Sequence, residues 1–183
     1  MSRSNGKKSF VKAADTTVAP EKSRAEVERL LRRYGAVGFA TAVDIEKGEI
    51  RVDFVVPNSA AKDAPRVPVR LPVSIHRVYD SMYGRPMLWD YKQTPAKQVH
   101  DPKGYDAKRL IQAERVAWRN LVLWIDAALS AATIGVQTIT EAFFAHTVVV
   151  DDGGRVERMM DYVERTGGAI GPGVRALLPS STT

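Results

Sequence analysis

The residues with the chemistry for catalysis are scattered along this chain of 183 residues. Its three histidines, His76, His100 and His146, have no metal-ligand spacing among themselves or with nearby acids. His100 followed by Asp101 suggests a metal-dependent phosphohydrolase, although a dipeptide in front of Pro102 equally describes a surface turn. The sequence contains no cysteine, which excludes a disulfide scaffold, a thiolate metal site and a cysteine nucleophile.

Two further patterns are weak candidates for a catalytic site. Acidic residues gather around a predicted hairpin, at Asp44, Glu46, Glu49 and Asp53. Paired carboxylates serve acid–base or metal chemistry, but hairpin tips are also commonly acidic for solubility. The glycine-rich stretch 167–173 lacks the preceding strand and the following lysine of a phosphate-binding loop. We therefore expect no catalytic residue, metal site or cofactor, with a metal-dependent nuclease or phosphohydrolase as the alternative.

Positive charge is concentrated in two segments. The formal net charge is +6 at pH 7. Residues 1–12 hold four basic residues and no acid, and residues 85–119 hold eight basic residues against four acids. Binding to a polyanion would explain this local concentration of positive charge, and so would an ordinary solvated surface.

The segment 76–119 also interleaves aromatic with basic residues. Aromatic rings offer stacking faces to unpaired bases, while cations hold the phosphate backbone. Lys108, Arg115 and Arg119 fall within a narrow arc of an ideal helix, which predicts a basic stripe. The predicted nucleic-acid-binding residues are Lys92, Lys97, Lys108, Arg109, Arg115, Arg119, Trp89 and Tyr91. As the alternative, the aromatics anchor a long loop and the charges form surface pairs.

The scaffold predicted to position these residues is an α+β domain. A capping box from Ser23 to Glu26 opens an amphipathic helix that closes at Gly35. Residues 37–43, 50–54 and 67–73 then predict a three-stranded antiparallel meander. The prolines in the third strand place it at an edge of the sheet.

The second half of the chain predicts mostly helices. A helix from about 106 to 132 should pack on the sheet through Ile111, Trp118, Val122, Ile125 and Leu129, with Trp124 also in the core. A second capping box, Thr138 to Glu141, opens a short helix. A strand at 148–150, a turn at 151–154 and a last amphipathic helix ending at Gly167 and Gly168 follow.

These elements predict a single domain over residues 21–168. Residues 1–20 are expected to form a flexible basic tail, residues 76–105 a long loop or insertion, and residues 169–183 an irregular tail. The N-terminus lacks the apolar core of a signal peptide, and no stretch reaches the roughly 18 apolar residues of a membrane span. We therefore expect a cytoplasmic protein without a membrane partner.

Several segments in series resemble a family of small phage and prophage proteins, namely residues 31–36, 50–54, 67–72, 114–121 and 135–146. The resemblance covers most of residues 23–165. Members of that family sit among replication and recombination genes, which implies a role in DNA metabolism in the cytoplasm of the infected bacterial host. The family supplies no catalytic residue. The stretch 81–104 looks longer than in the family.

The sequence thus favours a non-enzymatic phage accessory protein that binds nucleic acid in replication or recombination. Single strands are slightly favoured, because no helix-turn-helix, zinc finger or basic zipper is visible. One alternative is a modulator of a host polymerase or defence system, with the aromatics of 76–105 as a protein-binding hot spot. Another is a virion or assembly component. A homo-oligomer is left open.

Overall fold

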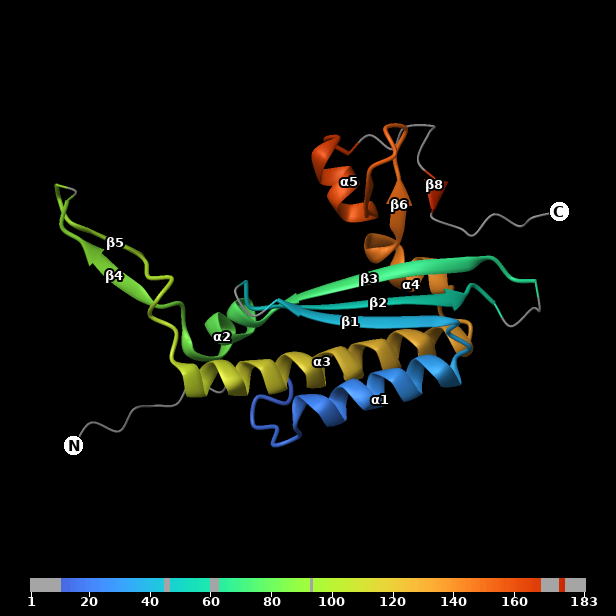
Figure 1. Ribbon diagram of the computed structural model, residues 1–183, viewed down its shortest axis with the longest axis horizontal. Coiled ribbons are helices and arrows are strands. Elements are labelled where there is room, and N and C mark those ends of the chain that lie inside the picture. The colour runs from blue at the N-terminus through green and yellow to red at the C-terminus, as the bar shows by residue number, and fades with distance from the viewer. Residues whose placement is uncertain (1–10, 45–46, 60–62, 93, 169–174, 177–183) are drawn as a thin grey trace.

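The computed structural model describes residues 11–44, 47–59, 63–92, 94–168 and 175–176, and its fold is α+β, as predicted (Figure 1). Two long helices lie side by side beneath an antiparallel sheet of order β1-β2-β3. The strands are β1 Gly38–Asp44, β2 Glu49–Pro57 and β3 Arg66–Ser74, and the helices are α1 Pro20–Arg33 and α3 Ala107–Thr133. The predicted meander is therefore confirmed.

One face of the sheet forms the core with the helices. Ile50, Val52 and Phe54 on β2 are buried, and so are their neighbours Val69 and Leu71 on β3. The opposite face is polar, and Asp53 accepts a hydrogen bond from Arg70 Nε at 2.9 Å. Apolar burial on one face, which contributes about 25 cal/mol per Å², fixes the register, because a shift by one residue would expose the whole apolar set.

Helix α3 packs on the sheet as expected, but not along its whole length. Its N-cap Asp106 accepts from Arg109 N at 2.9 Å, and Trp118, Ile125 and Leu129 are buried. Ile111, predicted to be in the core, is 52% exposed. The first turns of α3 extend past the ends of the strands (Figure 1), where α3 packs on α2 instead of the sheet and leaves Ile111 exposed.

Helix α1 begins three residues earlier than predicted. Its N-cap is Ala19, which has no side chain able to cap, and Pro20 occupies the first turn. Proline suits this position because its φ is preset and its missing N–H would have no helical partner. Ser23, the predicted cap, is instead buried within the helix, so the first capping box was wrong.

Residues 11–19 lie along α3 rather than forming part of a free tail. The Gln112 side-chain amide donates to Ala14 O at 3.1 Å and to Thr16 O at 2.9 Å, and the Asn120 amide donates to Lys12 O at 2.9 Å. The prediction of a flexible tail over 1–20 is therefore wrong for this part. Residues 1–10 lie outside the described residues.

The predicted long loop at 76–105 contains regular structure. It holds most of helix α2, Ile75–Tyr83, and an antiparallel hairpin of β4, Met87–Asp90, and β5, Lys97–His100. Ser74 caps α2 by accepting from Arg77 N at 3.3 Å. The hairpin escaped prediction because each strand has four residues and is largely exposed, so no alternation of apolar and polar residues reveals it.

A small second layer follows α3. It comprises α4 Ile139–Phe143, the 3-10 turn η1 Phe144–His146, β6 Val148–Val150, β7 Val156–Arg158, α5 Met159–Arg165 and β8 Arg175–Ala176. The capping box of Thr138 and Glu141 is confirmed. A bridge between Val69 and Thr147 joins this layer to β3. Because β8 pairs with β6, the tail predicted to be irregular contains a short strand.

Candidate nucleic-acid interface and a cationic cleft

The β4–β5 hairpin stands out from the body of the molecule (Figure 1). We name residues 86–101 the hairpin arm, and its base is closed by a hydrogen bond from Asp101 N to Pro86 O at 3.0 Å. The aromatic side chains on it are open to solvent, with Trp89 51% and Tyr91 79% exposed. Large apolar groups exposed together on a projecting element are typical of a contact surface.

The register of the arm determines which faces its side chains occupy. Trp89 lies opposite Gln98, and Asp90 lies opposite Lys97, so Trp89 and Lys97 point to opposite faces. Lys92 follows Tyr91 at the tip. Within the part of the chain that the structure describes, neither Lys92 nor Lys97 forms an ion pair. The arm thus presents two rings and two solvated ammonium groups.

A polar cluster attaches the arm to α2. Tyr105 donates its hydroxyl hydrogen to Asp80 Oδ1 at 3.3 Å, and His100 Nε2 lies 3.2 Å from the same hydroxyl. The His76 ring stacks on Tyr105 with 4.3 Å between ring centres. Burial, followed by the charge of Asp80, raises the pKa of Tyr105, so the phenol stays neutral and keeps its hydrogen for Asp80. These contacts fix the direction in which the arm leaves the body.

The first turn of α3 adds two of the predicted cations near the base of the arm. Lys108 and Arg109 are both exposed. The Arg109 guanidinium lies over the Tyr83 ring, 5.1 Å from its centre. This cation–π contact restricts the Arg109 side chain to one position. Both residues remain accessible to an anionic ligand.

The other two predicted cations on α3 face the protein. Arg119 Nη1 donates to Glu26 Oε2 of α1 at 2.6 Å, and both side chains are about one-third exposed. Arg115 is half-buried, with an Nε that has no hydrogen-bond partner among the described residues. Gln112, which lies between Lys108 and Arg115 on the same face of α3, contacts residues 14 and 16. Arg119 is therefore engaged by α1, whereas Lys108 at the other end of the predicted stripe is exposed, so only part of the stripe is open to a ligand.

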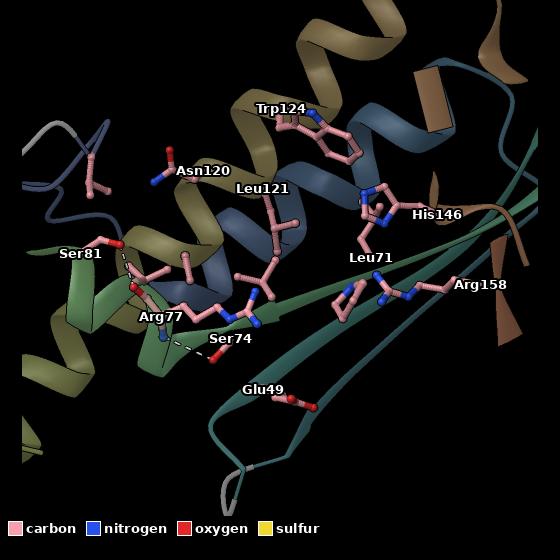
Figure 2. A pocket seen from close by; sticks show the side chains of 15 residues that line it. Glu49, Leu71, Ser74, Arg77, Ser81, Asn120, Leu121, Trp124, His146 and Arg158 are labelled. Atoms are coloured by element: carbon pink, nitrogen blue, oxygen red, sulfur yellow. Dashed lines mark hydrogen bonds between the residues drawn. The ribbon is translucent and has the colours of Figure 1, made fainter. Parts of the chain in front are cut away.

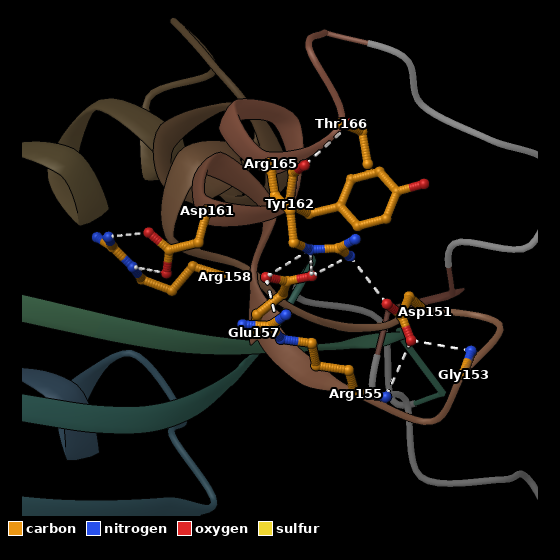
Figure 3. A network of polar contacts seen from close by, with 9 residues as sticks. All are labelled: Asp151, Gly153, Arg155, Glu157, Arg158, Asp161, Tyr162, Arg165 and Thr166. Carbon is orange, nitrogen blue, oxygen red and sulfur yellow. Dashed lines mark hydrogen bonds and ion pairs between the residues drawn. The ribbon is translucent and has the colours of Figure 1, made fainter.

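An ion-pair network organises β7 and α5 (Figure 3). Arg165 binds Glu157 and also reaches Asp151 Oδ2 at 2.8 Å. Arg158 makes two hydrogen bonds to Asp161, one of them from Nε to Oδ2 at 2.8 Å. This contact lowers the pKa of Asp161 and raises that of Arg158. The network holds Arg158 at the border of the second layer.

A cleft of about 760 Å³ lies where β3, α2 and α3 meet the second layer (Figure 2). Its floor is apolar, and its borders carry Arg77, Trp124 and Arg158. Trp124, predicted to be in the core, is 39% exposed, although its ring makes edge-to-face contacts with Phe143 and His146. Sequence reasoning missed this cleft, since residues 77, 124 and 158 share no local spacing that could announce a site.

No helix in the described part of the chain combines the length and apolar character needed to cross a membrane. Among the same residues, no three His, Asp or Glu side chains gather to hold a metal ion. Comparison with protein-family models, with curated proteins and with solved structures finds no match to this chain.

Proposed function

We propose that this chain is a non-enzymatic accessory protein that binds nucleic acid through the hairpin arm and the adjoining first turn of α3. The observation that carries the proposal is the arm itself, where Tyr91 is 79% exposed beside Lys92. Stacking on an aromatic side chain contributes roughly 1–3 kcal/mol per base. Exposed lysines add affinity by releasing counterions from the phosphate backbone.

Single strands are the favoured ligand, because exposed rings stack only on bases that are not already paired. The recognition residues are Trp89, Tyr91, Lys92, Lys97, Lys108 and Arg109. A setting in phage DNA replication or recombination is supported by the family resemblance of residues 23–165.

Fluorescence anisotropy with a labelled 20-nucleotide strand and its duplex, each at about 50 and 200 mM salt, tests the proposal. The variant Trp89→Ala/Tyr91→Ala should weaken binding to the single strand by about tenfold or more. The matched control, Lys22→Ala/Arg24→Ala, removes two exposed charges from α1 and should bind like wild type. Absence of salt-sensitive binding by the wild type, or an equal loss in the control, would overturn the proposal.

A modulator that binds a host protein is the second candidate, and the apolar residues of β4 favour it. Met87 and Leu88 are 47% and 41% exposed beside Trp89. Together they resemble the aromatic and Met-rich centre of a protein interface. Capture of one defined host protein that survives nuclease and high salt, and is lost in Met87→Ser/Trp89→Ala, would favour this function over nucleic-acid binding.

A further inference from the structure

We propose that the cleft bordered by Arg77, Trp124 and Arg158 binds a nucleoside 5′-phosphate, either free or at the end of a strand. The phosphate would lie between the two arginines and the base against Trp124. None of these three residues belongs to the hairpin arm, so this proposal and the function proposed above succeed or fail separately.

Arg77 supplies the charge that attracts the phosphate. Its backbone is fixed at both polar groups, because its N–H donates to Ser74 Oγ at 3.3 Å and its carbonyl accepts from Ser81 Oγ at 2.8 Å. The side chain extends into the cleft (Figure 2) and forms no ion pair with any residue that the structure describes. An arginine with a fixed backbone and an unengaged guanidinium suits a phosphate, which it can bind with two parallel hydrogen bonds.

Arg158 enters the cleft from the opposite side (Figure 2) and contributes oriented hydrogen-bond donors more than net charge. Asp161 occupies its Nε and one hydrogen of Nη2 and neutralises it. A guanidinium has five N–H donors, so three remain for a ligand. The pair with Asp161 also restricts the rotamers of Arg158, which lowers the entropic cost of binding an anion.

The aromatic end of the cleft, at Trp124, is where the base of the ligand would bind. Trp124 contacts Phe143 and His146 edge to face, with 5.3 and 5.5 Å between ring centres, and these contacts leave the indole 39% exposed. Burial, followed by the charge of Arg158, lowers the pKa of His146, so this ring is neutral at pH 7. A neutral ring beside an indole is better suited to an uncharged base than to a second phosphate.

The volume of the cleft and the position of Glu49 both agree with a phosphate between the arginines and a base at Trp124. A cleft of about 760 Å³ lies in the size range of small-molecule sites, which is about 300–1,000 Å³. Figure 2 shows Glu49 at the end away from Trp124. Its carboxylate would repel an anion placed near it, and the attractive position for the phosphate is therefore the middle of the cleft, between the arginines.

The test uses the full chain in a Trp89→Phe background, so that the exposed indole that reports binding is Trp124 while Trp118 stays buried. Deoxyadenosine 5′-monophosphate, deoxyadenosine and inorganic phosphate are titrated by fluorescence quenching and calorimetry. The monophosphate should bind about tenfold or more tightly than either fragment. Arg77→Ala should lose this advantage without a change in Tm, whereas the α1 variant Arg24→Ala should keep it.

A second arm of the experiment separates the two sources of the ligand. In Trp89→Ala/Tyr91→Ala, a strand with a 5′-phosphate is compared with the same strand carrying a 5′-hydroxyl. Tighter binding of the phosphorylated strand identifies a strand end, and equal binding identifies the free nucleotide. The proposal fails if the monophosphate gives neither quenching nor heat at millimolar concentration, or if Arg77→Ala binds it as well as the parent protein does.

Discussion

Arg119 of α3 and Glu26 of α1 form an ion pair across the contact between the two long helices, with 2.6 Å between Nη1 and Oε2. Both groups are partly shielded from water, which strengthens the attraction relative to an exposed pair. Arg119→Ala should therefore lower the free energy of unfolding by about 1–2 kcal/mol, because it leaves a half-buried carboxylate without its partner.

A double-mutant cycle with Glu26→Ala, measured by urea unfolding, should give a coupling energy of about 1 kcal/mol. The exposed pair of Arg32 and Glu28, within α1, is the matched control and should couple by less than about 0.5 kcal/mol. Affinity for nucleic acid should be unchanged in Arg119→Ala. A loss of nucleic-acid binding without a loss of stability would indicate that Arg119 contacts the nucleic acid.

Gly48, at the turn between β1 and β2, has two reasons to be glycine. Its φ is +61°, and a Cβ added there would lie 2.8 Å from Cε1 of His76. Gly135, which follows the C-cap of α3, has a φ of +76° with open space around it, so it shares the positive φ but not the close contact. Gly135→Ala should cost about 1 kcal/mol, and Gly48→Ala clearly more.

Thermal unfolding of the two glycine variants checks this difference. His76 is itself held by stacking on Tyr105, so movement of its ring would disturb the attachment of the arm. Equal losses of stability in the two variants would mean that the His76 ring moves aside without an energetic penalty. In that case, adding His76→Ala to Gly48→Ala should not restore any stability.

His146 should make the protein less stable in mild acid. Its folded-state pKa lies below the ordinary 6.5, because burial and then Arg158 disfavour the protonated ring. The unfolded chain therefore binds a proton that the folded chain does not, and stability falls as the pH drops through about 6.5 toward the lower folded-state pKa. Above that window the contribution of His146 is constant.

Urea unfolding at pH 7.5 and 5.5 measures this dependence. His146→Gln should flatten the fall, because a glutamine side chain does not titrate. If His146→Gln retains the full fall in stability, another group is responsible.

The two lysines of the arm should set part of the salt dependence of single-strand binding. Each phosphate contact that is lost lowers the slope of log K against log salt by about 0.7 for single strands. Lys92→Ala/Lys97→Ala should therefore reduce the slope by up to about 1.4, whereas Trp89→Ala/Tyr91→Ala should weaken binding with the slope unchanged. An unchanged slope in the lysine variant would show that these charges do not reach the backbone.

The parts of the fold that were predicted correctly are those with a strong local pattern. Alternation in β2, the long apolar period of α3 and the capping box at Thr138 each depend on residues close in sequence. Ser23 and Glu26 offered the same capping pattern, but Pro20 three residues earlier starts the helix and buries Ser23. A local motif could not reveal which of two adjacent starts gives the better packing.

The predicted site residues divide in the same way. Trp89, Tyr91, Lys92 and Lys97 lie on one projecting hairpin, which places them together without any long-range contact. The pattern of basic residues on α3 could not show that Arg119 pairs with an acid, because that acid, Glu26, is on α1. The cleft is lined by residues from the N-terminal segment, β2, β3, α2, α3, η1 and β7, and no spacing in the sequence expresses their approach.

The hydrogen bond between Asp101 N and Pro86 O brings the two ends of the arm to one point of the body. The chain therefore leaves and re-enters the domain at nearly the same place. The sheet of β1, β2 and β3 does not depend on the length of the arm. Insertions or deletions within the arm should therefore leave the three-stranded sheet and its core intact.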